Sequence, residues 1–201
     1  KKAVDYGITH LSCYALTVEE KTPLHKLIRT AQKQPVDSDK QASQFLLLMQ
    51  WLKAAHYEHY EVSNFALPGY RSKHNSAYWQ GKKYLGLGPS AHSYNGAARL
   101  WNKPANNLYI RSIAEGVLPQ ESEELTPTEQ LNEYIMTSLR TAEGLNLQQV
   151  QNYFGADKKI AIEKGLQKHL AHNLAIQQQD TVQLTESGML MADGIAADLF
   201  F

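Results

Sequence analysis

The order of predicted elements in residues 9–66 constrains the fold more than any other feature of the sequence. Residues 9–16, "THLSCYAL", are apolar enough and alternate enough to form a buried strand. Residues 39–56 follow with apolar side chains at helical spacing. Residues 57–66, "YEHYEVSNFA", alternate as a second strand. A strand, a helix and a strand predict a βαβ unit, and therefore an α/β fold with a parallel sheet or a piece of a barrel.

A different pattern begins near residue 118. "LTPTEQ" offers Thr126 as N-cap, Pro127 at the first helical position and Glu129 three residues after the cap, which together make a capping box. The apolar face of the helix that follows ends near Gly144, a residue that stops helices. The helix start at this point predicts a second structural unit.

The rest of the chain completes that unit. Two more helices are predicted over residues 146–154 and 158–171, then a hairpin around "QQD" and a last helix in residues 186–201. Helices followed by a hairpin predict a small winged-helix-like α+β domain. We place the two domains at residues 1–120 and 121–201, since "LPQESEE" reverses the local charge at their border.

Composition excludes several classes of protein. Twenty basic side chains balance twenty acidic ones, so no global charge favours nucleic acid or an anionic membrane. A single cysteine, Cys13, excludes an internal disulfide framework and a Cys-ligated cluster built by this chain alone. The apolar runs are far too short to span a membrane, and we expect a cytoplasmic protein. The chain opens without Met on a helix end and a strand, so we expect the C-terminal part of a longer protein.

The charge balance is uneven along the chain. Residues 62–114 contain no Asp or Glu, but they carry seven basic side chains, namely Arg71, Lys73, Lys82, Lys83, Arg99, Lys103 and Arg111. One interpretation is a basic face neutralised by acids from elsewhere in the fold. The other is a pocket for an anionic ligand.

The segment "KHNSAYWQGKKYLGLGPSAHSYNG", residues 73–96, combines several residue types that could form a site. Gly86 and Gly88 let a backbone approach a ligand closely, and amides there could hold a carboxylate or a phosphate. A plain turn between a strand and a helix explains the same glycines. The flanking His74 and His92 are either ligands or hydrogen-bonded structural residues. Tyr78 and Trp79, which follow His74, offer flat surfaces for an aromatic ligand or for ordinary packing.

Longer stretches of the chain resemble a known family. "YEVSNFALPGYRSKHNSAYWQGKKYLGLGPSAHSY" is similar to a region of radical S-adenosylmethionine proteins of the oxygen-independent coproporphyrinogen III oxidase family. "HNSAYW" matches the His-Asn-x-x-Tyr-Trp signature of the haem-chaperone (HemW) branch. "HLSCYALTVEEKTPL", "EGLNLQQVQNYFG" and "VQLTESGMLMADGIAADLF" resemble further parts of that family, in the same order.

The resemblance implies a fold and cofactors. It implies the C-terminal portion of a partial (β/α) radical-SAM barrel, followed by the small winged-helix-like domain. It also implies a [4Fe–4S] cluster and S-adenosylmethionine in the full-length parent. The Cys-x3-Cys-x2-Cys cluster loop and the Gly-Gly-x-Pro segment are absent from this chain, and Cys13 lies elsewhere. The fragment is therefore expected to bind no cluster and to perform no radical chemistry by itself.

The resemblance also assigns residues. His92, with Gly86 and Gly88, corresponds to a position that lines S-adenosylmethionine. The haem or porphyrin side corresponds to His74, Asn75, Tyr78 and Trp79, with His74 as candidate ligand of haem iron.

Three functions compete at this point. A haem chaperone would hold haem for delivery to haem-accepting proteins, whereas an oxidase would decarboxylate the propionates of coproporphyrinogen III through a 5′-deoxyadenosyl radical. The third candidate, a nucleic-acid-binding winged helix, is disfavoured because residues 146–201 carry four Lys and no Arg against six acidic residues. The signature favours the chaperone.

Overall fold

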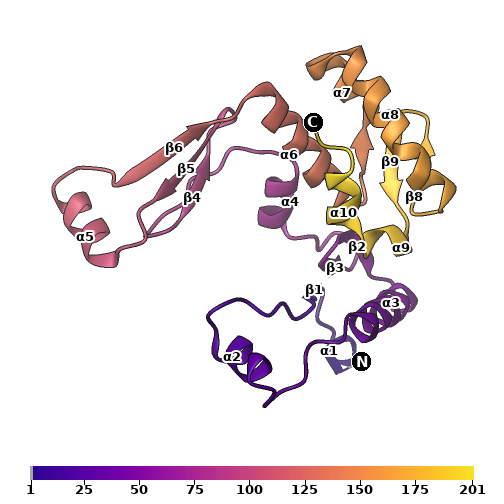
Figure 1. The fold of residues 1–201 in the computed structure, drawn as a ribbon, viewed down its shortest axis with the longest axis horizontal. Helices are drawn as coiled ribbons and strands as arrows, with labels where there is room; N and C mark the ends of the chain where they lie inside the picture. The colour runs from indigo at the N-terminus through magenta and orange to yellow at the C-terminus, as the bar shows by residue number, and fades with distance from the viewer. Residues whose placement is uncertain (1) are drawn as a thin grey trace.

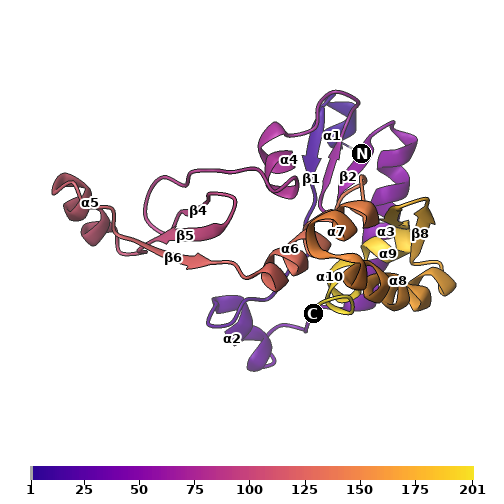
Figure 2. The same ribbon diagram turned by 90° about the horizontal axis from the view of Figure 1, so that it is seen from above.

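The computed structural model describes residues 2–201, which form three parts. An N-terminal part (residues 2–81) and a C-terminal domain (residues 125–201) lie together, and an arm (residues 82–124) projects from them (Figures 1 and 2). Each part contains one small antiparallel sheet of three strands, in the orders β1-β3-β2, β4-β5-β6 and β7-β9-β8. The expected mixture of helices and sheet is therefore present, but it is divided among three small sheets in the described residues.

The N-terminal part contains four helices and three strands. They are α1 (Lys2–Asp5), β1 (His10–Ser12), α2 (Pro23–Arg29), α3 (Ser38–Ala54), β2 (Glu58–Glu61), β3 (Asn64–Ala66) and α4 (Lys73–Trp79). Helix α3 confirms the predicted amphipathic helix. Its N-cap Asp37 accepts a hydrogen bond from the amide of Lys40, and its buried Met49 and Leu52 pack with Tyr57 and Phe65.

Residues 57–66 were predicted as one strand, and this is wrong. The segment folds back on itself, so β2 and β3 form a hairpin. The Glu61 carboxylate stabilises the reversal because it accepts hydrogen bonds from the Ser63 amide (3.0 Å) and the Asn64 side chain (2.5 Å). Strands β1 and β2 are both antiparallel to β3, so they run parallel to each other but are not neighbours. The predicted crossover therefore exists, with β3 inserted between its strands.

The arm is built from β4 (His92–Tyr94), β5 (Ala98–Asn102), α5 (Asn106–Ala114) and β6 (Gln120–Glu124). Strand β6 pairs with β5 along its whole length, although the domain border at 120/121 falls at its start. Several large apolar side chains of the arm are exposed, namely Leu85, Leu87, Ile110, Val117 and Leu118. The arm is thus a thin sheet with little core of its own.

The C-terminal domain contains five helices and a three-stranded sheet. They are α6 (Pro127–Leu139), β7 (Leu145–Asn146), α7 (Leu147–Phe154), α8 (Ala156–Ala171), β8 (Ala175–Gln178), β9 (Thr181–Leu184), α9 (Glu186–Met189) and α10 (Ala192–Ala197). The predicted helices and hairpin are confirmed. The single last helix is wrong, because the chain leaves helical geometry at Met191 (φ −118°, ψ 17°) and forms two short helices.

The capping box at the start of α6 is confirmed. The Thr126 hydroxyl accepts from the Glu129 amide (3.3 Å), and the Glu129 carboxylate accepts from the Thr126 amide (2.7 Å). The helix ends at Leu139, earlier than Gly144. Gly144 instead takes φ +76° in the turn into β7.

Candidate functional site

Helix α4 carries the His-Asn-x-x-Tyr-Trp segment. Ser72 is its N-cap and accepts a hydrogen bond from the Asn75 amide (3.2 Å), which starts the helix directly before the motif. Helical spacing places residues four apart on the same face. His74 and Tyr78 therefore share one face of α4, and Asn75 and Trp79 share another.

The exposed face of α4 begins a row of aromatic rings. The His74 ring is exposed and stands perpendicular to the Tyr78 ring, with centroids 4.8 Å apart. Tyr78 contacts Tyr84 edge-on at 4.5 Å, and Tyr84 lies 6.3 Å from Tyr94 of β4. Edge-to-face contacts of this kind hold aromatic rings in fixed orientations.

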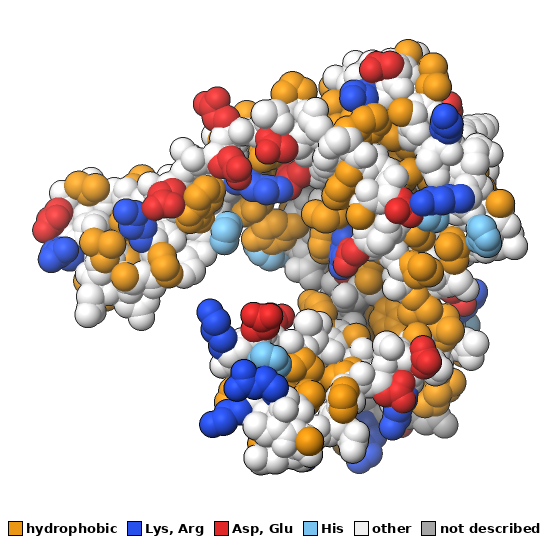
Figure 3. Space-filling model, viewed as in Figure 1, with side chains coloured by type: hydrophobic (Ala, Val, Ile, Leu, Met, Phe, Trp, Pro, Cys, Tyr) orange, Lys and Arg blue, Asp and Glu red, His pale blue; other side chains and the backbone are white. Residues whose placement is uncertain are grey.

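A cleft of about 1010 Å³ lies between α4, the first sheet, the base of the arm and the C-terminal domain. This volume is at the upper end of what small-molecule sites occupy, roughly 300–1,000 Å³. Figure 3 shows an open space between the arm and the segment below it that carries α2. The cleft has a markedly aromatic lining, which includes Tyr14, Tyr60, Tyr78, Trp79, Tyr84, Tyr94, Tyr134, Tyr153 and Phe154.

Three tyrosines of the cleft are held as neutral hydrogen-bonding groups. Burial raises the pKa of Tyr60, Tyr84 and Tyr134 above that of an ordinary tyrosine. The cleft therefore offers flat apolar surfaces together with phenolic hydroxyls, and no phenolate at these three positions.

Most of the charges in the cleft are paired. Arg71 contacts Glu58 (2.9 Å) and Glu143 (2.6 Å), and Arg99 contacts Glu133 of α6. On the arm, Lys103 lies 3.8 Å from Glu121. Three of the seven basic residues in the acid-free stretch are thus neutralised by acids from elsewhere in the fold. The other four, Lys73, Lys82, Lys83 and Arg111, make no ion pair with a described residue, and Lys82 lines the cleft.

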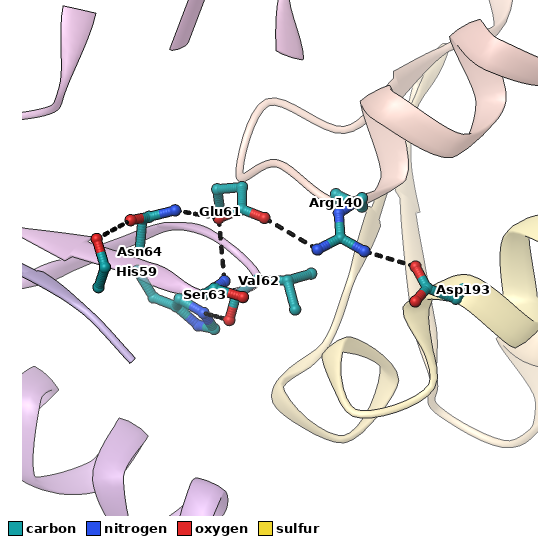
Figure 4. Close-up of polar contacts among 8 residues, drawn as sticks. His59, Glu61, Val62, Ser63, Asn64, Arg140 and Asp193 are labelled. Carbon is teal, nitrogen blue, oxygen red and sulfur yellow. Dashed lines mark hydrogen bonds and ion pairs between the residues drawn. The ribbon is translucent and has the colours of Figure 1, made fainter. Parts of the chain in front are cut away.

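A polar network joins the first sheet to the C-terminal domain beside the cleft (Figure 4). Glu61 is only 1% exposed, and its carboxylate contacts the Arg140 guanidinium (3.2 Å). Arg140 also binds Asp193 at the start of α10 (2.6 Å). Its guanidinium carbon lies 5.1 Å from the centre of the Trp79 ring, which is cation–π distance. From its place in the C-terminal domain, Arg140 therefore contacts the motif helix α4, the first sheet and helix α10.

The structure separates the two groups of predicted site residues. Asn75, Tyr78 and Trp79 line the cleft, and His74 lies beside them on α4. Gly86, Gly88 and His92 are in the arm, outside the cleft lining. The assignment of these three residues to S-adenosylmethionine stays a prediction.

Gly86 and Gly88 have structural roles in the arm. The Gly86 amide donates to the Ser93 hydroxyl (2.9 Å), and the Gly88 amide to the Tyr109 hydroxyl (3.2 Å). The idea of free amides at this turn is therefore wrong for this structure. A Cβ on Gly86 would collide with the His92 carbonyl, so glycine is needed for close contact with β4. The chain then enters a hairpin and not the expected helix.

Several cleft residues were missed from the sequence, above all Tyr14, Tyr134 and Arg140. Tyr14 lies just after strand β1, Tyr134 lies in helix α6, and Arg140 directly follows α6. No local sequence pattern marks these positions. The count of eleven tyrosines is the one signal that the sequence offers, and it does not say where they meet.

The described residues contain no group of three or more His, Cys, Asp or Glu side chains that could hold a metal ion. Cys13 is half-buried, and burial raises the pKa of its thiol, which disfavours the thiolate that metals bind. This chain alone does not fit a Cys-ligated iron–sulfur cluster. No helix in the described part of the chain has the length and apolar character of a membrane span.

The chain is similar to known proteins along nearly its whole length. It is 34% identical to the "Heme chaperone HemW" of Mycobacterium tuberculosis over 98% of this chain and 49% of that protein. It is 29% identical to the "Heme chaperone HemW" of Bacillus subtilis over 96% of this chain and 51% of that protein. The chain thus spans about half the length of the curated relatives that it matches.

A solved structure shares the fold. The chain matches the Escherichia coli coproporphyrinogen III oxidase (HemN), described as a radical SAM enzyme, with a TM-score of 0.72 at 17% identity. The match covers 99% of this chain and 49% of that one, and it confirms the expected fold. Residues 125–191 match the family described as the HemN C-terminal domain. The chain is therefore similar to HemW-type proteins over nearly its whole length, and its residues 125–191 match the HemN C-terminal domain.

Proposed function

We propose that this chain binds haem as part of a HemW-like haem chaperone, which delivers haem to haem-accepting proteins. The observation that carries the proposal is the position of "HNSAYW" on α4, at the wall of a large cleft lined by aromatic side chains. The relatives at 34% and 29% identity are named as haem chaperones, which supports the same function.

His74 is the proposed ligand of the haem iron. Its imidazole is exposed at the end of the aromatic row, and Tyr78 packs edge-on against it without covering it. A neutral imidazole is a common axial ligand of haem iron. Contact with Tyr78 would hold the imidazole plane in one orientation, as a ligand requires.

The remaining cleft residues suit the other parts of haem. Trp79 and the tyrosines provide flat surfaces for a porphyrin ring. Lys82 lines the same cleft, makes no ion pair with a described residue, and can pair with a propionate. Arg71 and Arg99 are less suited, because carboxylates of the protein already bind them.

The test replaces His74 by Ala and measures haem binding by absorbance titration. We expect the affinity to fall by about tenfold or more, since even groups that only support a metal ligand cost that much. The Soret band should shift, and the circular dichroism spectrum should not change. His172→Ala is the matched control, because His172 is also exposed but lies in the C-terminal domain outside the cleft. An unchanged Soret band and affinity in His74→Ala would remove the direct support for haem ligation.

A second variant separates the two predicted groups of residues. His92→Ala alters an exposed side chain of the arm that lies near Trp101 (6.5 Å between ring centres). We expect it to affect S-adenosylmethionine binding by the full-length protein more than haem binding. A larger loss of haem affinity than in His74→Ala would reverse the assignment.

The alternative function is the oxidase, in which the full-length protein would use S-adenosylmethionine and a [4Fe–4S] cluster to decarboxylate coproporphyrinogen III. The shared fold supports it, but at 17% identity that likeness concerns the fold alone. The single Cys13 supplies no cluster, so only the full-length protein could show this activity. Conversion of coproporphyrinogen III by that protein would favour the oxidase over the chaperone.

Nucleic-acid binding by the C-terminal domain is disfavoured. Lys159 pairs with Asp180 and Lys168 with Asp198, each at 2.7 Å, and Lys158 lies over the Phe201 ring (4.0 Å). Three of the four lysines of α8 are thus engaged within the protein and not arranged as a phosphate-binding face. Tight, salt-sensitive binding to duplex DNA would contradict this conclusion.

A further inference from the structure

We infer that Arg140 is a positioning residue for the motif helix: it fixes the Trp79 indole at the cleft wall and makes this position depend on the C-terminal domain. The inference deepens the proposed function. The contact between Arg140 and Trp79 does not require haem, and only the expected effect on haem affinity rests on the proposed function.

Arg140 is held from several sides. It follows α6 directly, and its backbone carbonyl accepts a hydrogen bond from the Val62 amide (3.0 Å) in the β2–β3 turn. Its guanidinium binds Glu61 (3.2 Å) on β2 and Asp193 (2.6 Å) at α10. Its side chain is 19% exposed, so the contact with the buried Glu61 is largely shielded from water, whereas the Asp193 side chain is 77% exposed. A side chain held at both ends in this way has little freedom to move.

The buried carboxylate of Glu61 requires the Arg140 guanidinium as its partner. Its carboxylate is 1% exposed, and a buried carboxylate is stable only when it is paired and hydrogen-bonded. Ser63 and Asn64 donate to one of its oxygens, and Arg140 contacts the other. Arg140 supplies the positive charge in this group, so it cannot leave Glu61 without a large cost.

The same guanidinium also lies over the Trp79 ring. The guanidinium carbon is 5.1 Å from the indole centre, while two of its nitrogens are occupied by the carboxylates. Planar guanidinium groups can use their edge for carboxylates and their face for an aromatic ring at once. Because its charge is already balanced by Glu61 and Asp193, Arg140 is a support for the indole and not a partner for a haem propionate.

The consequence is a link between two parts of the molecule. Trp79 is the last residue of α4, and Asn75 lies one turn before it on the same face. Arg140 belongs to the C-terminal domain. A shift of that domain would withdraw the guanidinium from Trp79 and change the wall of the cleft on which a flat ligand rests. The C-terminal domain would thereby influence ligand binding without supplying the iron ligand.

The first measurement concerns Trp79 itself and needs no haem. In the 201-residue chain with Trp51→Phe and Trp101→Phe, Trp79 is the remaining indole, and its exposure is measured by acrylamide quenching of fluorescence. Arg140→Met should raise the quenching constant by about twofold, because the guanidinium no longer covers the ring. Arg140→Lys, which keeps the charge but not the flat face, should give an intermediate value.

The second measurement is haem titration in the wild-type background. Arg140→Met should weaken haem binding by about tenfold, as expected for a residue that supports a site without ligating the metal. The Soret maximum should stay unchanged, since His74 is intact. His74→Ala should instead shift the band.

Lys53→Met is the matched control. Lys53 of α3 pairs with Glu186 of α9 (2.8 Å), so it also joins the N-terminal part to the C-terminal domain, but it lies outside the cleft lining. We expect no change in Trp79 quenching or in haem affinity. Equal effects in Lys53→Met and Arg140→Met would mean that general attachment of the domain matters and would overturn the inference.

Other outcomes are equally decisive. If Arg140→Met fails to fold, Arg140→Lys decides, and quenching equal to that of the parent chain would contradict a positioning role. If the wild-type protein binds no haem, the proposed function fails, while Trp79 quenching still tests the role of Arg140 separately.

Discussion

The C-terminal domain and the arm differ in how far they bury their apolar side chains. The C-terminal domain encloses one continuous core, whose members include Leu131, Ile135, Leu139, Leu145, Leu147, Val150, Ile162, Leu166, Val182, Ile195 and Leu199. The arm contributes no residue to either of the two apolar clusters found in the described chain. Its Leu87 is 80% exposed, whereas Leu166 of the domain is completely buried.

This difference teaches which part of the chain can specify its own structure. A helix with one apolar face is stable when another element of the same unit covers that face, as α6 and α8 do in the C-terminal domain. The arm is held mainly by strand pairing and by local hydrogen bonds such as Asn102 to the Gly88 carbonyl (2.9 Å). Such a region opens at a lower free energy than a closed core.

The strongest test of the comparison is the removal of a large side chain from each part. Leu166→Ala should lower the free energy of unfolding by about 2–5 kcal/mol, because it leaves a cavity in a closed core. Leu87→Ala should change it by less than about 0.5 kcal/mol, since the side chain is exposed. Urea denaturation of both variants measures the difference. Similar losses would show that Leu87 is buried in solution and would break the comparison.

A second pair of variants concerns glycines in close backbone contacts. Gly144 has φ +76°, and a Cβ there would meet the Val182 carbonyl of the domain sheet. Gly144→Ala should therefore destabilise the whole domain by about 1–3 kcal/mol. Gly86→Ala, whose Cβ would meet the His92 carbonyl, should loosen the arm locally.

Native-state hydrogen exchange distinguishes these two effects. In Gly86→Ala, faster exchange should be confined to the amides of the arm, while Gly144→Ala should accelerate exchange throughout residues 125–201. If Gly86→Ala lowers the protection of the C-terminal domain equally, the arm and the domain unfold as one unit.

The smallest expected effect concerns the N-cap of α6, at the border between the arm and the C-terminal domain. Thr126→Ala removes the side chain that caps α6 and should cost about 1 kcal/mol. Hydrogen bonds from the Thr126 hydroxyl and amide hold the pKa of Glu129 below its ordinary value. A lowered folded-state pKa gives stability that is present at neutral pH and is lost as the pH falls through that pKa.

The lowered pKa of Glu129 predicts how the stabilisation by the Thr126 cap depends on pH. The difference in stability between wild type and Thr126→Ala should shrink as the pH falls below the lowered pKa of Glu129. Thermal unfolding followed by circular dichroism across acidic pH measures it. Glu129→Gln serves as the control, because it has no charge to lose and should flatten the dependence. A difference that grows on acidification would contradict the assigned capping role.

The sequence predicted local structure best where the signal was complete within a few residues. The capping box, helices α6 to α8 and the hairpin β8–β9 belong to this class. The prediction of a single strand over residues 57–66 was wrong because apolar and polar side chains can alternate through a tight hairpin just as they do along one strand. The reversal depends on the carboxylate of Glu61, whose burial and pairing with Arg140 are not visible in the segment itself.

The candidate site divides in the same way. "HNSAYW" marked three of the cleft residues, and the structure places them on one helix that was not predicted, α4. The acid-free stretch suggested a basic pocket, but Glu133 and Glu143 reach back from the C-terminal domain to neutralise two of its arginines. Those pairs join residues far apart in the chain, and spacing gives no hint of them.

By itself, the sequence determined helices α3 and α6 to α8, the capping box of α6, the C-terminal hairpin and the motif, because these depend on hydrogen bonds and faces formed within one short segment. The tertiary structure alone decided that tyrosines from position 14 to position 153 share one cleft, that three of the seven basic residues of the acid-free stretch are neutralised, and that Arg140 lies over Trp79. The physical reason is that burial and ion pairing act between surfaces brought together by folding, whatever their separation along the chain.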